Sequence, residues 1–175
     1  MNNLDNCNNM RKIAANLVYT CIEKPIKFGH LVVDDDGTIL DIVDTGGKLI
    51  EEEGLEYHNG VLVPGFIINS SQAEMTEKSV RMRFLAGVQI DYIEPNQLSY
   101  SSKEPVVNQM FGLQTDGASF DDALANATIG AARALEIDNE YGCFKKGIKP
   151  GVVLLYPFDF VNNKMRHDTL PKRLV

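Results

Sequence analysis

The sequence predicts a mixed α+β protein, and three observations support this prediction. Short runs rich in Val, Ile and Tyr, separated by turn residues, fill residues 13–63 and predict an antiparallel sheet of about four strands. Apolar residues recur at helical spacing over residues 73–87 and again over residues 119–136. A further apolar run, residues 152–156, predicts a buried strand after the second of these helices.

Composition and charge exclude several classes of partner. The chain has 175 residues, 44% of them hydrophobic, which is enough to bury the core of one ordinary domain or two small ones. Its formal net charge is −7, whereas nucleic-acid phosphates call for a basic surface, so we expect no nucleic-acid partner. No apolar run approaches the 18 residues of a membrane span, so we expect no membrane partner either.

The cysteines and the N-terminus indicate a cytoplasmic protein. Cys7, Cys21 and Cys143 are widely spaced and include no CxxC pair, which favours reduced thiols over a disulfide framework or a zinc finger. The first residues, MNNLDNCNNM, are polar and lack the apolar core of a signal peptide. We therefore expect residues 1–12 to form a loose N-terminal tail.

Local signals place the individual elements. Asp36-Gly37 between two β runs predicts a hairpin, because glycine supplies the positive φ of a tight turn. Residues 73–87 predict a helix with Phe84 and Leu85, together with Met75 and Val80, near one side and Gly87 as its stop. Residues 88–94 then predict a strand, and residues 106–113 a short helix.

The helix expected over residues 119–136 carries the clearest signals. Ser119 is a good N-cap, and Asp121 and Asp122 suit the positive end of the helix dipole. An apolar stripe at helical spacing predicts the buried side, and it consists of Leu124, Ala127, Thr128, Ala131 and Leu135. The glycine-punctuated segment 142–151 lacks the Gly-Lys-Ser/Thr ending of a phosphate loop and predicts a hairpin. The tail after it has room for one or two edge strands.

Two segments resemble one known family. Residues 37–67, with Val-Pro-Gly-Phe near their end, resemble the N-terminal part of the amidohydrolase superfamily. Residues 127–160, beginning ATIGAARAL, resemble the last barrel helix and the C-terminal strands of the same proteins. The branch most resembled is the cytosine-deaminase-like group of aminohydrolases and chlorohydrolases. The resemblance covers about two thirds of the chain, with Pro150-Gly151 in place of the usual Ala-Asp before the last strand.

The resemblance implies a specific architecture. Residues 13–65 and 137–175 would form the small β-sandwich domain of the amidohydrolase composite type, built from N- and C-terminal strands. Residues 66–136 would form a vestigial, two-stranded α/β remnant of a TIM barrel. A whole barrel takes about 250 residues, and roughly 50 residues separate Phe66 from Ser119. About two of the eight barrel strands would remain, too few to close a barrel.

The resemblance also implies a lost metal site. The family holds zinc or iron with a His-x-His after the first barrel strand, two further histidines and an Asp after strand eight, and the metal activates a water. Ser70, Gln72 and Asn96 stand at the first and last of these ligand positions. Ser and Gln are poor zinc ligands, and Asn lacks the charge of Asp. We expect no catalytic residue, no metal ligand and no cofactor.

The remaining polar residues give weaker candidates. His30, His58 and His167 have no ligand spacing. Three carboxylates, Glu74, Asp91 and Glu94, could make an oxygen site, although solvated side chains are the more common role of such residues. Ser70-Ser71 has no histidine nearby in sequence to activate a nucleophile.

Three hypotheses for the function follow. The first is a non-catalytic amidohydrolase remnant with a structural or interaction role, forming a homo-oligomer through exposed apolar strand edges in residues 61–68 and 88–93. The alternative is a metal-dependent hydrolase of C–N (non-peptide) bonds, deaminase-like, with zinc or iron and a site completed by another chain. The third is the product of a decayed gene that still folds.

Overall fold

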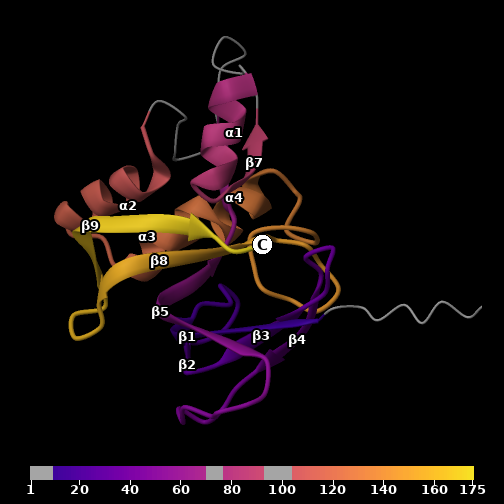
Figure 1. Cartoon of the computed structure of the whole chain (residues 1–175). Coiled ribbons are helices and arrows are strands. Elements are labelled where there is room, and N and C mark those ends of the chain that lie inside the picture. Colours follow the sequence, from indigo (N-terminus) through magenta and orange to yellow (C-terminus); the bar gives the residue numbers. More distant parts are fainter. Residues whose placement is uncertain (1–9, 70–76, 93–103) are drawn as a thin grey trace, which may run out of the picture.

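The computed structural model describes residues 10–69, 77–92 and 104–175, and predictions for residues 1–9, 70–76 and 93–103 lie outside this range. The chain is a mixed α+β protein whose core is mostly sheet, as predicted. Strands β1 to β4 lie at one end of the molecule, helix α1 and strand β7 lie at the other, and β8 and β9 run between them (Figure 1).

A seven-stranded sheet forms the main body of the protein. Its strand order is β4-β3-β1-β5-β8-β9, and β2 pairs with β1 beside this path. The strands are β1 (Arg11–Val18), β2 (Ile26–Lys27), β3 (His30–Val33), β4 (Ile39–Val43), β5 (Leu55–Pro64), β8 (Val152–Asp159) and β9 (Lys164–Arg173). The direct pairing of β5 with β8 joins the N-terminal and C-terminal strands in one sheet.

The hairpin predicted at Asp36-Gly37 is confirmed. Strands β3 and β4 are antiparallel, and Gly37 adopts a φ of 82° in the turn between them. The Asp34 carboxylate accepts hydrogen bonds from the backbone N–H groups of Asp36, at 3.0 Å, and Thr38, at 2.8 Å. This Asp side chain therefore closes the turn in the way such side chains usually do.

One pairing of the N-terminal strands differs from the prediction. Strands β1 and β5 are parallel, with Ile13 opposite Glu56 and Val18 opposite Leu62. The β3–β4 hairpin and the connection after it carry the chain back, so that β5 starts beside the start of β1. Residues 13–63 thus contribute five strands, and the purely antiparallel sheet that was predicted is wrong.

The strands for which a β-sandwich was predicted form one continuous sheet, and this sheet curls over. The Ile39 N–H donates to the Ile148 carbonyl at 2.9 Å, and the Gly147 N–H donates to the Ile39 carbonyl at 2.8 Å. These bonds bring the segment before β8 against β4, although three strands separate β4 from β8 in the sheet. The curl encloses a core from both halves that includes Leu31, Leu62 and Leu154.

The segment 142–151 does not form the predicted hairpin. It holds no strand of its own, and its backbone bonds to β4 and to Thr20, whose carbonyl accepts from the Phe144 N–H at 2.9 Å. Phe144 is fully buried in the core of the curled sheet. The glycines here let the chain turn while it fills the open side of the curl.

A second, two-stranded sheet follows directly from β5. Strands β6 (Phe66–Asn69) and β7 (Val88–Tyr92) are parallel and are joined through helix α1 (Glu77–Leu85). The predicted helix and strand are confirmed within the described residues. Phe84 and Leu85, two of the apolar residues expected near one side of this helix, are 49% and 58% exposed.

Two helices, α2 (Val106–Thr115) and α3 (Phe120–Ala127), pack on one face of the large sheet, and a third, α4 (Ile129–Ala134), packs against β6 of the small sheet. The N-cap prediction is confirmed, because the Ser119 hydroxyl accepts from the Asp122 N–H at 3.0 Å. The single helix predicted over residues 119–136 breaks at Thr128, whose backbone leaves helical geometry and whose hydroxyl donates to the Leu124 carbonyl at 2.7 Å.

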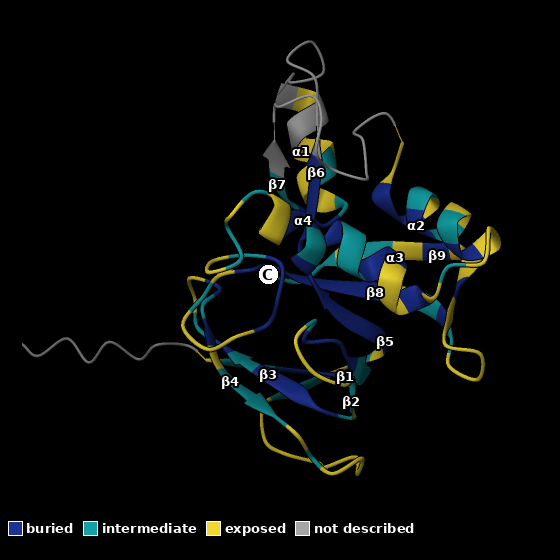
Figure 2. Ribbon diagram, turned by 180° about the vertical axis from the view of Figure 1, so that it is seen from behind, coloured by how far each residue is buried: buried dark blue, intermediate teal, exposed yellow. Residues whose placement is uncertain are grey.

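Close packing fastens the small sheet to the large one. The Gly65 N–H donates to the Pro150 carbonyl at 3.0 Å. Gly87 has a φ of 91°, and a Cβ there would lie 2.8 Å from a Val153 methyl group. The second half of β5, the first half of β8 and residues 66–68 of β6 are buried (Figure 2).

We expect Gly87→Ala to destabilise the fold more than Gly46→Ala. Both positions have positive φ, which costs an alanine about 1–2 kcal/mol. A Cβ at Gly46 meets nothing within 4 Å, whereas one at Gly87 overlaps Val153 and adds roughly 1–3 kcal/mol. Urea unfolding of both variants measures the difference, and equal losses would contradict close packing at Gly87.

Candidate functional site

The predicted ligand positions follow the carboxyl ends of β6 and β7. Asn69, the last residue of β6, pairs with Tyr92, the last residue of β7, so the two strands end side by side. Ser70 and Gln72 come directly after β6, and Asn96 follows β7 by four residues. These three positions, like Glu74 and Glu94, lie outside the described residues.

A small apolar cavity lies beside the small sheet, next to Ile68 near the end of β6 and Val88 at the start of β7. It has a volume of about 200 Å³ and lies between β6, β7, α1, α2 and β9. Ile68, Val88 and Val106 contribute to its apolar lining, and Arg83 and Glu104 are its charged groups. Within the described ranges, no group of three His, Cys, Asp or Glu residues comes together to hold a metal ion. The cavity thus has room for a few carbon atoms, and its described lining residues provide no set of metal ligands.

The three histidines lie on separate strands and do not converge. His30 is buried on β3, with its Nε2 atom 3.7 Å from a Glu52 carboxylate oxygen. His58 lies on β5, and His167 is exposed on β9. All three belong to the large sheet, whereas the ligand positions expected from the resemblance follow the strands of the small one.

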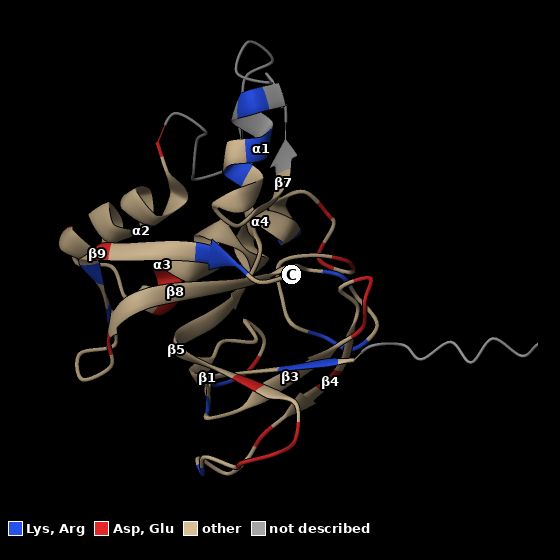
Figure 3. Ribbon diagram, in the orientation of Figure 1, with Lys and Arg blue, Asp and Glu red and all other residues tan. Residues whose placement is uncertain are grey.

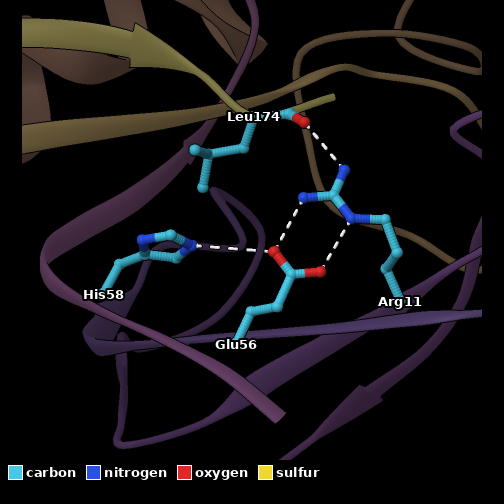
Figure 4. A network of polar contacts seen from close by, with 4 residues as sticks. All are labelled: Arg11, Glu56, His58 and Leu174. Carbon is cyan, nitrogen blue, oxygen red and sulfur yellow. Dashed lines mark hydrogen bonds and ion pairs between the residues drawn. The ribbon is translucent and has the colours of Figure 1, made fainter. Parts of the chain in front are cut away.

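The best-ordered polar cluster joins Arg11, Glu56 and His58 (Figure 4). The Arg11 guanidinium donates twice to the Glu56 carboxylate, at 2.8 and 2.9 Å, and once to the Leu174 carbonyl at 2.9 Å. His58 Nε2 lies 4.0 Å from the same carboxylate. The Arg11 hydrogen bonds lower the pKa of Glu56, and burial lowers the pKa of His58.

This cluster acts as a clamp. Arg11 begins β1, Glu56 lies near the start of β5, and Leu174 follows the end of β9, so the bonds join three parts of the sheet. A bidentate Arg–carboxylate pair has a fixed geometry suited to that task. Sequence reasoning missed it, because only the parallel register of β1 and β5 brings residues 45 positions apart into contact.

Two larger, open cavities share one wall. Their volumes are about 610 and 590 Å³, and residues 22–25 line both. The second cavity also reaches Cys21, whose pKa burial raises to about 12. Burial raises the pKa of Cys143 as well. A raised thiol pKa leaves little thiolate at neutral pH, so both thiols react slowly with electrophiles.

Among known proteins, the chain resembles solved structures only. No family model and no curated protein matches the chain. N-acetyl-D-glucosamine-6-phosphate deacetylase from Mycobacterium smegmatis is 14% identical over 61% of this chain and 31% of its own, with a TM-score of 0.38. Aminofutalosine deaminase from Helicobacter pylori is 15% identical over 73% and 48%, with a TM-score of 0.36. A D-hydantoinase is 18% identical over 79% and 32%, with a TM-score of 0.34.

These three structures belong to the amidohydrolase superfamily. The chain spans less than half the length of each of them. At these identities and TM-scores the likeness fixes neither an activity nor a site. Among the described residues, no helix combines the length and the apolar character needed to cross a membrane.

We expect Glu56→Gln to remove a stabilisation that depends on pH. Because the folded-state pKa of Glu56 lies below its ordinary value of 4.5, its contribution is complete above that pH and is lost as pH falls through the lower value. The pair is more than one third exposed, so solvent screening limits the effect to about 1 kcal/mol.

Urea unfolding at pH 7 and pH 3 measures this effect. The gap between wild type and Glu56→Gln should narrow at pH 3. The exposed Glu53→Gln variant is the control. A gap that stays constant between the two pH values would contradict the clamp.

Proposed function

We propose that the protein is a non-catalytic remnant of a metal-dependent amidohydrolase with a structural or interaction role. The observation behind this proposal is the pair of parallel strands that end side by side, followed by Ser70, Gln72 and Asn96. A metal-dependent amidohydrolase would need imidazole and carboxylate ligands at these strand ends.

The connection of the two sheets supports this origin. Strand β5 leads through Gly65 directly into β6, and the chain then runs through α1 into the parallel strand β7. A strand, a helix and a parallel strand are the repeating unit of a (β/α)₈ barrel. A closed barrel needs several such units, and the second sheet here has two strands.

The donor chemistry does not fit zinc or iron. Hydroxyl and amide oxygens bind these ions weakly compared with imidazole and carboxylate groups. The histidines at positions 30, 58 and 167 lie on β3, β5 and β9 and do not reach a common point. We therefore assign no catalytic step to this chain.

The exposed side chains of helix α1 support an interaction role. Met82, Phe84 and Leu85 are all largely exposed on this one helix. Lys78 and Arg81 are exposed beside them, which makes α1 a basic element in a chain of net charge −7 (Figure 3). A second copy of this acidic chain offers the opposite charge, so we propose a homo-oligomer that uses α1 and the edge of β7.

Strand β5 does not belong to this proposed interface. Sequence analysis placed an open edge over residues 61–68, but β5 pairs with β1 on one side and with β8 on the other. Its apolar side chains are buried in the hydrophobic cores on both faces of the sheet. Of the two strand edges predicted to pair with another chain, the one in the small sheet therefore remains in the proposal.

We expect the purified, untagged protein to hold less than about one tenth of a zinc ion per chain after dialysis against dilute zinc. Elemental analysis by mass spectrometry measures this content, and a His₃ metalloenzyme of known zinc content serves as the control. Close to one tightly held ion per chain would overturn the proposal. It would favour the alternative, a deaminase-like hydrolase of C–N bonds with a rebuilt site.

We expect the double variant Met82→Lys, Leu85→Lys to shift the protein from an oligomer to a monomer. Added charge on α1 repels a second copy and removes the apolar area that it would cover. Light scattering coupled to size-exclusion chromatography measures the mass. The control is Val161→Lys, since Val161 is 93% exposed in the connection between β8 and β9. A wild-type monomer at high concentration would contradict the proposed interface.

A further inference from the structure

We propose that Cys21 and Cys143 are a redox-active pair that closes into an intramolecular disulfide when the protein meets a hydroperoxide. The two residues are 122 positions apart in sequence, and sequence analysis treated them as unrelated thiols. Both are free thiols in this structure. The inference is independent of the proposed function, because it uses neither the small sheet nor the expected metal site.

The backbone brings the two cysteines together. The Phe144 N–H donates to the Thr20 carbonyl at 2.9 Å, and each cysteine is the chain neighbour of one of these two residues. Standard backbone dimensions then limit the distance between the two cysteine Cα atoms to about 8 Å, and any bend along the path shortens it. The Cα atoms of disulfides lie roughly 4.4–6.8 Å apart, so a small adjustment is enough.

Both cysteines lie near the break between α3 and α4. The Thr128 hydroxyl lies 3.6 Å from Cys21 Sγ. Gly142, which precedes Cys143, packs so closely on the same turn that a Cβ there would lie 2.9 Å from the Thr128 carbonyl oxygen. The negative charge of a Cys143 thiolate also contributes to raising the pKa of Cys21, in addition to burial. Cys21 Sγ thus contacts Thr128, and the residue before Cys143 packs on the same turn.

The two thiols differ in their access to solvent. Cys21 is half-buried and lines the open cavity of about 590 Å³, together with Tyr19 and Leu124. Cys143 is 2% exposed. A small oxidant therefore reaches Cys21 first, and Cys143 is placed as the resolving thiol.

The chemistry balances in two steps. The Cys21 thiolate attacks a peroxide oxygen, an S–O bond forms as the O–O bond breaks, and the leaving alkoxide takes up a proton. Cys143 then attacks the sulfur of the Cys21 sulfenic acid, the S–S bond forms, and the hydroxyl leaves as water with the Cys143 proton. Two thiols are oxidised, and one hydroperoxide is reduced to an alcohol and water.

The disulfide would tie together two parts of the fold. Cys21 follows β1 and Cys143 lies in the segment before β8, so the bond would link the end of β1 to that segment beside the Thr20–Phe144 hydrogen bond. The backbone at Cys21 has a φ of 63°, an uncommon value for a residue other than glycine. Strained backbone of this kind is found more often at functional positions than elsewhere.

The experiment uses the full chain with Cys7→Ser, so that two thiols remain. The folded protein is treated with hydrogen peroxide over hours, because a raised pKa leaves little thiolate and makes the first step slow. We expect the free-thiol count to fall from two to zero. Mass spectrometry should find a peptide pair joined at positions 21 and 143, and dithiothreitol should restore both thiols.

Two further variants test the order of events. Cys143→Ser should stop at the sulfenic acid of Cys21, which dimedone traps as a stable adduct. Cys21→Ser should leave Cys143 unreacted. Circular dichroism before treatment verifies that each variant is folded.

Two results would overturn the proposal. One is a folded Cys7→Ser protein that keeps both thiols, while the urea-unfolded sample loses them under the same oxidant. The other is oxidation of Cys21 to the sulfinic acid with Cys143 still a thiol, because that outcome means that Cys143 does not reach Cys21.

Discussion

The fold depends on strand β5. It pairs in parallel with β1 on one side and antiparallel with β8 on the other, so it joins the N-terminal and C-terminal strands. Its side chains alternate between two cores: Val61 and Val63 contact the helical layer, and Leu62 fills the curled sheet. A shift of one residue in register would reverse this alternation. The Arg11–Glu56 clamp fixes that register by joining β5 to β1.

Features set by neighbouring residues could be predicted from the sequence, and features set by distant ones could not. The hairpin at Asp36-Gly37 and the N-cap at Ser119 depend on contacts within five residues, and both are confirmed. The parallel pairing of β1 with β5 and the break at Thr128 depend on the tertiary fold, and both were missed. The ligand positions rest on family resemblance alone, and the described residues place only the strand ends that precede them.

Arg173 makes the attachment of the small sheet different from that of a barrel unit, where neighbouring strands would provide the support. Its guanidinium donates to the Gln89 side-chain oxygen and to the Val88 carbonyl, and it lies 3.8 Å from the centre of the Phe84 ring. Burial lowers the pKa of Arg173. A single cation at the end of β9 thus binds both β7 and α1.

This attachment has a consequence for any interaction role. Arg173 and the glycines at positions 65 and 87 hold one side of the small sheet against the large one. A cation stacked on Phe84 keeps that ring partly covered, whereas Met82 and Leu85 remain mostly exposed on the same helix. Met82 and Leu85 thus remain available for apolar contacts on a helix that also exposes Lys78 and Arg81. This combination of apolar and basic side chains is the basis of the proposed contact with a second, acidic copy of the chain.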